Sequence, residues 1–503
     1  MFYLSNQINL PLTTSHYHKN FMEKKTHIAV VSAPIVSHQI AISNFIKKLL
    51  QLHPNKFHIT LIIPVLESLS NASKSTIDSL SSLNIDIIVL PPINLPPQTV
   101  PTLKLPLAMS LTMPSILDAL NSITSSTNTS KLVAIIADYF AYEVFTFAKK
   151  LNILSYTYFP SSATVLSLCF HSTALEETVS GEFRDLKEPI KMPGCVPFQG
   201  TDLPSSFQDR TSESYNHFLL RSKGINLCDG ILVNSFVELE SEAVEAMNEG
   251  SINGSHPPVY MVGPIMQKNS DNNQNESQCL SWLDEQKPNS VVFVSFGSGG
   301  TISQNQMNEL ALGLELSSQK FLWVVREPND IASANYFAVP NPNLLGQEDP
   351  LCFLPKGFIE RTKKQGFLVS NWAPQVEILS HKAIGGFVTQ CGWFSTLECV
   401  VNGVPIIAWP LFAEQRMIAT ILADGIKIAV RPKIDNVSGV VEKGEIVNVL
   451  KRLMEGDEGV EICERMKVLQ DDAATAIEVD GSSLTIISQL VTKWTNMEGY
   501  NEN

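Results

Sequence analysis

Short, nearly continuous apolar runs alternate with helix-length segments along most of this chain, and this alternation limits the folds it can adopt. In the first half, the runs occupy residues 27–34, 58–64, 85–90, 131–138, 154–159 and 230–236. In the second half, they occupy residues 290–298, 321–326, 366–372, 383–390, 404–410 and 427–432. Runs of this kind, rich in β-branched residues, are typical of strands buried on both faces of a parallel sheet. The pattern therefore predicts an α/β protein built from βαβ units.

A polar stretch separates the two sets of apolar runs. Residues 265–278 include QKNSDNNQNES, which has no apolar periodicity and is typical of a domain linker. A chain of 503 residues exceeds one ordinary domain, so we expect two doubly wound, Rossmann-like domains that face a cleft. The expected parts are an N-terminal domain over residues 22–264, a C-terminal domain over residues 279–480, and residues 481–503, a helix that packs back on the N-terminal domain followed by a tail.

The net charge and the cysteines restrict the possible partners. A formal charge of -14 argues against nucleic acid or an anionic membrane surface as a partner. The eight cysteines are scattered without metal-ligand or CxxC spacing, as expected for reduced thiols in the cytoplasm. No apolar stretch approaches the roughly 18 residues of a membrane span. Residues 1–21 are polar and irregular, and we expect them to be a disordered or non-native extension before Met22. The sequence thus predicts a cytoplasmic monomer without an integral membrane segment.

Several common nucleotide-binding and catalytic motifs are missing. No GxGxxG follows the first apolar run, where SAPIVSHQ stands instead, and the GSGG at 297–300 has the wrong spacing for a dinucleotide site. There is also no P-loop lysine, no GxSxG elbow and no Asp-x-Asp pair that could hold a divalent metal on a diphosphate. The sequence therefore disfavours a nicotinamide-dependent enzyme, and we expect chemistry without a cofactor or metal.

One run near the C-terminal end carries the clearest functional signal. Residues 372–415 read WAPQVEILSHKAIGGFVTQCGWFSTLECVVNGVPIIAWPLFAEQ, which joins an aromatic opening to glycine pairs, a Ser-Thr helix start and two carboxylates. Together with residues 176–210 and 290–303, this run resembles the plant family 1 UDP-glycosyltransferases, near the hydroquinone and monolignol glucosyltransferases, and the similarity extends from His27 to Trp494. The resemblance implies a B-type fold and an inverting enzyme that transfers a sugar, most readily glucose, from a UDP-sugar to a hydroxyl of a small phenol or phenylpropanoid.

The same resemblance implies a donor site. Trp372 would stack on the uracil, with Ala373 and Gln375 at the edge of the base, and Glu398 would accept the ribose hydroxyls. A tryptophan face and a carboxylate suit these tasks. The full set implied for UDP-sugar binding is Ser298, Trp372, Ala373, Gln375, Gln390, Gly392, Trp393, Ser395, Glu398, Glu414 and Gln415.

The diphosphate and the sugar would lie farther along this run. The diphosphate is expected at the start of a helix beginning at Ser395, near backbone N–H groups at Gly392 and the hydroxyl of Ser298. A helix N-terminus can replace a metal ion in binding an anion. Glu414 and Gln415 would bind the sugar hydroxyls, and a terminal glutamine goes with glucose in this family.

Two residues of the first half are candidates for catalysis. His38 follows the first apolar run and Asp138 ends the fourth. Taken alone, His38 could be a helix cap and Asp138 a turn-former. By resemblance they form a general-base dyad, in which a neutral imidazole takes the proton of the acceptor hydroxyl and the carboxylate orients the imidazole.

The chain departs from the family pattern HCGWNS, which here reads QCGWFS. Gln390 replaces a histidine and Phe394 replaces an asparagine near the expected diphosphate. Gln390 can still donate a hydrogen bond, but Phe394 cannot. The alternatives are a working glucosyltransferase, an enzyme for another UDP-sugar such as xylose or galactose, or a catalytically weakened binding protein. The side chains of Trp393 and Trp409 are expected to pack in the core.

The acceptor pocket is expected on loops of the N-terminal domain. Phe140, Tyr142 and Phe159 are candidate lining residues, together with the insertion from Glu327 to Cys352. Loops of this kind vary on a fixed scaffold, so they do not identify the acceptor. His381 is expected to order a turn.

Overall fold

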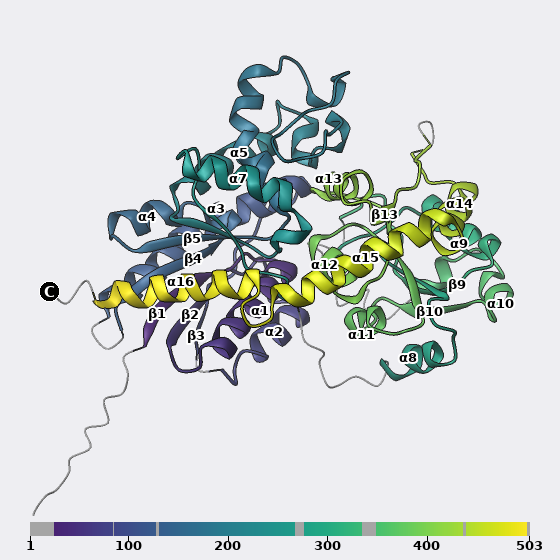
Figure 1. Ribbon diagram of the computed structural model, residues 1–503, viewed down its shortest axis with the longest axis horizontal. Coiled ribbons are helices and arrows are strands. Elements are labelled where there is room, and N and C mark those ends of the chain that lie inside the picture. The colour runs from purple at the N-terminus through teal and green to yellow at the C-terminus, as the bar shows by residue number, and fades with distance from the viewer. Residues whose placement is uncertain are drawn as a thin grey trace, which may run out of the picture.

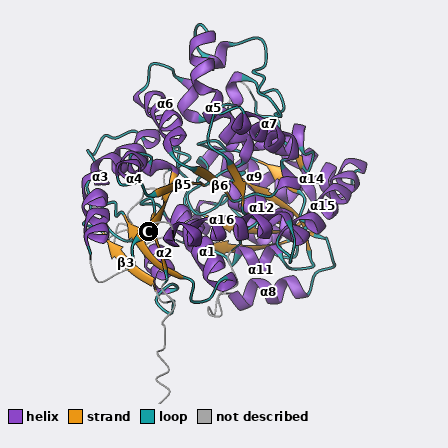
Figure 2. Cartoon of the chain, turned by 60° about the vertical axis from the view of Figure 1, so that its left-hand side comes forward, coloured by secondary structure: helices purple, strands orange, loops and turns teal. Residues whose placement is uncertain are grey.

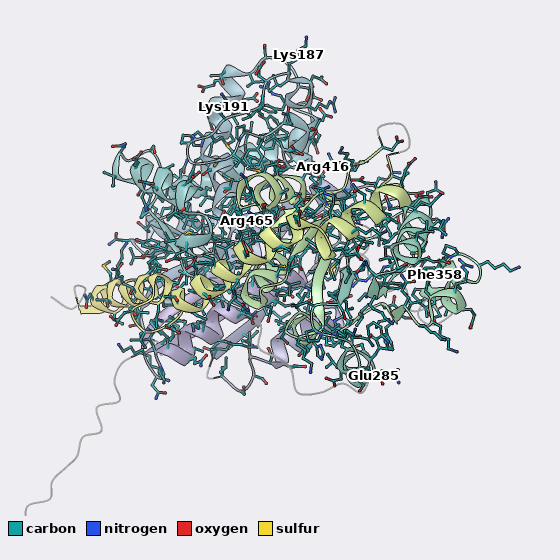
Figure 3. The ribbon with its side chains drawn as sticks, turned by 45° about the vertical axis from the view of Figure 1, so that its right-hand side comes forward. Lys187, Lys191, Glu285, Phe358, Arg416 and Arg465 are labelled. Atoms are coloured by element: carbon teal, nitrogen blue, oxygen red, sulfur yellow. The ribbon has the colours of Figure 1, made fainter. Side chains whose placement is uncertain are left out.

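The computed structural model of the chain describes residues 25–83, 85–126, 130–266, 276–333, 349–435 and 439–499. It contains two parallel sheets, each enclosed by helices, as Figure 2 shows with the strands in orange. The expected α/β class with two doubly wound, Rossmann-like domains is confirmed. The expected extension over residues 1–21 and most of the expected linker lie outside the described residues.

The N-terminal sheet has the strand order β3-β2-β1-β4-β5-β6-β7. Its strands are β1 (Thr26–Val31), β2 (Phe57–Ile63), β3 (Ile85–Val89), β4 (Leu132–Asp138), β5 (Leu154–Phe159), β6 (Gly230–Val233) and β7 (Val259–Met261). The helices are α1 (Val36–Leu52), α2 (Asn71–Asp78), α3 (Pro101–Ser125), α4 (Val144–Lys150), α5 (Ala163–Thr178), α6 (Glu213–Gly224) and α7 (Ser241–Ile252). Short 3₁₀ turns include η1 (Tyr139–Ala141), η2 (Phe183–Asp185), η3 (Gly200–Asp202), η4 (Ser205–Gln208), η5 (Ile225–Leu227) and η6 (Val237–Leu239).

The C-terminal sheet has the strand order β10-β9-β8-β11-β12-β13. Its strands are β8 (Val291–Ser295), β9 (Lys320–Val325), β10 (Gly366–Ser370), β11 (Ile384–Thr389), β12 (Ile406–Ala408) and β13 (Ala429–Val430). The remaining helical elements are α8 (Glu276–Asp284), α9 (Gln304–Ser317), η8 (Pro350–Phe353), α10 (Phe358–Thr362), α11 (Gln375–Leu379), α12 (Trp393–Asn402), α13 (Gln415–Thr420), the π-helical η9 (Ile421–Gly425), α14 (Lys443–Met454), α15 (Asp457–Ala476) and α16 (Ser482–Gly499).

The order of each sheet reverses at one pair of adjacent strands. In the N-terminal sheet β1 pairs with β4, and in the C-terminal sheet β8 pairs with β11. Connections that leave such a pair run to opposite faces of the sheet and open a crevice at the carboxyl ends of the strands. The residues that follow β1 and β4 therefore meet at one crevice, and those that follow β8 and β11 meet at another. The two catalytic candidates of the N-terminal half, His38 and Asp138, lie at the first crevice.

All twelve expected strands are present, and one further strand was not predicted. This strand, β7, has only three residues and lies at the edge of the sheet, directly after Pro257 and Pro258. Its brevity hides the pattern on which strand prediction depends. The nearly continuous apolar sequence of the inner strands reflects burial on both faces, since every residue of β1, β4 and β8 is buried.

Helix α16 returns to the N-terminal domain, as Figure 1 shows in yellow. Its residues Ile487, Leu490, Val491 and Trp494 belong to the apolar cluster formed by one face of the N-terminal sheet. Trp494 is fully buried and its ring meets Phe57 and Tyr156 edge to face. The last helix of the chain thus completes the core of its first domain.

Among the described helices, α3 is long and apolar enough to cross a membrane by length and composition alone, although the sequence suggested no such stretch. Its most apolar window is 44% buried inside the protein. The helix contains Pro106 and Pro114 and packs against η1, α4 and α6. In this fold α3 is therefore a core helix of the N-terminal domain.

Candidate active site

A cavity of about 510 Å³ lies between the two domains and collects most of the expected site residues. From the N-terminal domain it is lined by the start of α1, the start of α3, the loops after β4 and β5, and α6. From the C-terminal domain it is lined by loops after β8 and β10, the start of α12 and the start of α13. The expected residues on its wall are His38, Ser298, Trp372, Ala373, Gln375, Gln390, Trp393, Ser395, Glu398, Glu414 and Gln415.

His38 and Asp138 form a hydrogen-bonded pair at the crevice of the N-terminal sheet. His38 is the third residue of α1, and Asp138 ends β4, the strand beside β1. Nδ1 of His38 lies 2.7 Å from Oδ2 of Asp138, whose other oxygen accepts the backbone N–H of Phe140 at 3.0 Å. The carboxylate lies behind the imidazole, since Asp138 is fully buried and only His38 reaches the cavity. A carboxylate can only accept, so the proton sits on Nδ1 and Nε2 is left as the acceptor.

Three polar side chains are joined on the C-terminal wall. Gln375 begins α11, and its Nε2 donates to Oε2 of Glu398 at 2.5 Å and to Oγ of Ser395 at 3.0 Å. Glu398 and Ser395 are both buried in α12. Beside them Ala373 is buried, whereas Trp372 is 53% exposed and lines the cavity. An open aromatic face next to a buried carboxylate suits a flat base joined to a ring with two hydroxyls.

The N-terminus of α12 opens toward the same cavity. The helix begins at Trp393, two residues before the expected start, and Gly392 is its N-cap without a side-chain capping bond. First-turn N–H groups without a side-chain cap form a site for an anion. The amide nitrogen of Gln390 lies close to the backbone of both Gly297 and Gly392. If these glycines carried a Cβ atom, it would lie 2.1 Å from this nitrogen at Gly297 and 3.0 Å from it at Gly392. Gln390 can therefore present an N–H donor beside this helix start.

The start of α13 supplies the remaining polar groups. Gln415 is buried, and its side-chain oxygen accepts the backbone N–H groups of Leu411 and Phe412, each at 2.9 Å. These two bonds fix the amide plane and leave its NH₂ group as the donor. Glu414 accepts the hydroxyl of Ser161 at 3.2 Å, which links α13 to the N-terminal domain.

Comparisons with known proteins agree with this geometry. The family model described as UDP-glucoronosyl and UDP-glucosyl transferase matches residues 257–471. Hydroquinone glucosyltransferase of Rauvolfia serpentina is 43% identical over 479 residues, covering 94% of this chain and 99% of that protein. The chain belongs to the plant family 1 UDP-glycosyltransferases.

Further relatives support this assignment over most of the chain. UDP-glycosyltransferase 72B1 of Arabidopsis thaliana is 41% identical over 478 residues, covering 94% of this chain and 97% of that protein. The solved structure of Phytolacca americana UGT2 complexed with UDP-2fluoro-glucose and pterostilbene is 40% identical, with a TM-score of 0.83, and covers 93% of this chain and 99% of that chain. This protein is therefore a glycosyltransferase of the B-type fold that binds a UDP-sugar.

Phe394, one of the two unusual residues of this glycosyltransferase, lies where the domains meet. Phe394 is partly buried, lines the cavity and packs against the apolar cluster of the N-terminal domain. The preceding Trp393 is buried, and its indole N–H donates across the interface to the carbonyl of Asn234 at 2.9 Å. Trp393 therefore packs as expected, and Phe394 contributes apolar contact between the domains in place of a polar group.

The acceptor end of the cavity differs in part from the expectation. Phe140 and Phe159 line the cavity, but Tyr142 does not, because its ring packs against Gly224 in α6. Of the insertion from Glu327 to Cys352, Ser333 lines the cavity, and residues 334–348 lie outside the described residues. His381 orders a turn as expected, since its ring accepts the N–H of Ala383 at 3.1 Å.

Sequence reasoning missed two helices that line this end. The start of α3 contributes Thr102, and α6 contributes Ser214, Phe218 and Arg221. The hydroxyls of Thr102 and Ser214 lie 2.6 Å apart and join the two helices. One available signal was Arg221, a charged residue on the face of α6 that otherwise carries small and aromatic side chains.

The ionisation of Glu398 gives a test of the donor site. Burial raises the pKa of Glu398 to about 7, and the hydrogen bond from Gln375 opposes this shift. The ribose hydroxyls need the ionised carboxylate as their acceptor, so uridine should bind up to about tenfold more weakly for each pH unit below 7. Uridine has the ribose but no phosphate to titrate. Calorimetric titration of uridine between about pH 5.5 and 8 measures this dependence.

Glu398→Gln serves as the control, because it should bind uridine more weakly and its affinity should not change over the same pH range.

The raised pKa of Glu398 also affects the stability of the fold. Between pH 4.5 and about 7, the folded chain keeps a proton on Glu398 that the unfolded chain has already released. The free energy of unfolding of the parent protein should therefore fall as the pH rises through this window. The Tm of Glu398→Gln should rise relative to that of the parent protein over the same window, because the variant has no carboxyl group at this position. A uridine affinity that is independent of pH in the parent protein would contradict the ribose assignment.

Proposed function

We propose that this glycosyltransferase transfers glucose from UDP-glucose to a hydroxyl of a small phenol or phenylpropanoid, with inversion at the sugar carbon. The observation that carries this proposal is the His38–Asp138 pair, which faces the start of α12 across one cavity. A base for the acceptor and an anion site for the leaving diphosphate are the two groups that such a transfer requires.

The reaction follows from these positions. Nε2 of His38 takes the proton of the acceptor hydroxyl, and Asp138 stabilises the imidazolium that forms. The acceptor oxygen forms a bond to the anomeric carbon as the bond from that carbon to the diphosphate oxygen breaks. The electron pair leaves with UDP, toward the N–H groups of α12, the hydroxyl of Ser395 and the amide of Gln390. Attack opposite the leaving group turns an α-linked donor into a β-glycoside.

Glucose is the proposed sugar because of the start of α13. Gln415 is held by two backbone N–H groups and directs its NH₂ group as a donor, and Glu414 lies beside it as an acceptor. Relatives in the comparison include a protein named as a hydroquinone glucosyltransferase and one complexed with UDP-2fluoro-glucose and pterostilbene. These names support both the glucose donor and a phenolic acceptor.

The remaining properties are proposed from the sequence. We propose a cytoplasmic monomer that requires neither a metal nor another cofactor, since the start of α12 and the amide of Gln390 supply donors for the diphosphate. Activity that is unchanged by a chelator such as EDTA, and a single species of about 55.5 kDa in solution, would agree with this proposal.

Release of UDP and the mass of the product test the proposed function directly. We expect the purified protein to release one UDP for each glycoside formed from UDP-glucose and hydroquinone or a phenylpropanoid alcohol. UDP-xylose and UDP-galactose serve as matched donors and should react more slowly. Faster transfer from either of them would contradict the glucose assignment. Binding of UDP without any transfer would instead favour a weakened enzyme, the alternative that Gln390 and Phe394 raise.

A further inference from the structure

Arg221 is a buried cation on the wall of the acceptor end of the cavity. It lies in α6, is only 6% exposed, and lines the cavity. Its guanidinium carbon lies 4.5 Å from the ring centre of Phe140, 5.3 Å from that of Tyr139 and 5.8 Å from that of Phe218. The guanidinium is thus packed among aromatic rings, in a residue that lines the cavity.

Nothing else in the described part of the chain neutralises this charge. Among the described residues, Arg221 forms no ion pair, and its Nε and Nη1 have no hydrogen-bond partner. Contacts with aromatic faces offset part of the cost of burying a guanidinium, but they leave Nε and Nη1 without acceptors. Arginine is almost never buried unless it is paired. Nε and Nη1 are enclosed by protein atoms, so a negatively charged partner in the cavity would offset the charge of the guanidinium without bonding to these two nitrogens.

The position of Arg221 relative to His38 limits the size of this partner. The ring of Phe140 lies 5.8 Å from the ring of His38 and 4.5 Å from the guanidinium carbon of Arg221. The two groups can be no farther apart than the sum of these distances. This limit excludes acceptors with a long spacer between the two groups and leaves room for a single benzene ring that carries a hydroxyl and a carboxylate. The apolar walls of Phe140 and Phe218 suit the faces of that ring.

We propose that the acceptor site selects phenols that carry a carboxylate, with hydroxybenzoates as the class, and that Arg221 binds the carboxylate while His38 deprotonates the hydroxyl. This inference rests on the proposed function, since it concerns the same site. The carboxylate pairs with the charge of the guanidinium and takes no part in bond formation. The phenolic oxygen loses its proton to His38 and forms the bond to the sugar, so the product is a glucoside and not a glucose ester.

A comparison of 4-hydroxybenzoate with its methyl ester tests this proposal without any mutation. The two molecules differ in charge but share the ring and the hydroxyl. We expect kcat/KM for the acid to exceed that for the ester by about 10- to 100-fold, the range for a hydrogen-bonded charge pair. Equal values of kcat/KM for the acid and the ester would overturn the proposal. So would a product of the acid that mild alkali hydrolyses, because that product would be a glucose ester and not a glucoside.

Variants then locate the effect on α6. Arg221→Met, whose side chain suits the aromatic surroundings, should lower kcat/KM for the acid by about 10- to 100-fold and change that for the ester by less than about threefold. Arg221→Lys should restore only part of the loss, because an ammonium keeps the charge but lacks the planar guanidinium that packs on the rings of Tyr139 and Phe140. Lys223→Met is the matched control, since it removes an exposed charge from the same helix, and it should change neither rate. An equal loss for both acceptors in a folded Arg221→Met variant would contradict a role in recognising charge.

The inference and the proposed function can fail separately. If hydroquinone is glucosylated but 4-hydroxybenzoate is not, the transferase function stands and the role of Arg221 is wrong. If no phenol is glucosylated, the proposed function fails, and calorimetric binding of the acid and the ester to the UDP-loaded protein still decides the role of Arg221. Tighter binding of the acid that is lost in Arg221→Met supports the proposal, and equal binding refutes it.

Discussion

Replacing His38 with alanine is expected to lower kcat by about 10²- to 10⁴-fold, the usual contribution of a general base. The imidazole is the group of the Asp138 pair that reaches the cavity, and it lies on the domain opposite to the ribose and diphosphate groups. The affinity for UDP, measured by calorimetry, should therefore remain within about twofold of the parent value. Initial rates at saturating UDP-glucose and acceptor measure the change in kcat.

Two further variants make this prediction specific. Asp138→Asn should keep the shape of the pair but weaken the stabilisation of the imidazolium, so it too should lower kcat with little effect on UDP binding. His58→Ala is the matched control, because Nε2 of His58 lies 2.8 Å from Asp86 in a similar pair that lies outside the cavity. It should leave kcat unchanged. A His38→Ala variant that loses UDP affinity and turnover in equal measure would contradict the assignment.

The double reversion Gln390→His and Phe394→Asn is expected to raise kcat/KM for UDP-glucose by about 10- to 100-fold. Phe394 offers no hydrogen-bond donor to the leaving diphosphate, and a bond to a charged group contributes roughly 1.5 to 3 kcal/mol. The same change should lower Tm, because Phe394 packs against the apolar cluster of the N-terminal domain and an asparagine there loses that contact. Steady-state kinetics and thermal unfolding measure the two effects.

Phe394→Leu separates packing from hydrogen bonding. It keeps an apolar side chain between the domains without adding a donor, so Tm should stay near the parent value and kcat/KM should not rise. If the double reversion leaves transfer from UDP-glucose unchanged but speeds transfer from another UDP-sugar, then Gln390 and Phe394 set the choice of donor. That outcome would contradict the prediction that Gln390 and Phe394 act only by weakening the binding of the diphosphate.

Much of the fold was predictable because burial on both faces leaves a simple signature. Every inner strand appears in the sequence as an apolar run. Candidate site residues can then be predicted at the carboxyl ends of these runs, as for Asp138 at the end of β4. The adjacency of β1 and β4, which brings His38 to Asp138, depends on sheet order. No local pattern encodes that order, so the pairing came from resemblance to a family. The start of α12 was misplaced by two residues because Gly392 caps it without a side-chain bond that a motif could reveal.

The parts that could not be predicted depend on contacts between distant residues. Arg221 reaches the cavity only because α6 packs against α3 and α5, about 100 and 50 residues earlier in the chain. Tyr142 follows Phe140 by two residues, yet its ring turns toward Gly224 and away from the cavity. The bond from Gln375 to Glu398 depends on two side-chain conformations across separate helices. Neither composition nor periodicity carries information on such contacts.

The return of α16 to the first domain has a consequence for biosynthesis. A ribosome makes the N-terminal domain first, and domains of most proteins can fold as they emerge. Residues of α1 cover part of the sheet face that receives Trp494, but the part beneath α16 stays uncovered until the entire C-terminal domain has been translated. The nascent chain thus carries an exposed apolar surface through the second half of its synthesis. Premature termination shortly before Ser482 would leave a complete donor-binding domain attached to an unfinished first domain, a natural substrate for chaperones and proteases.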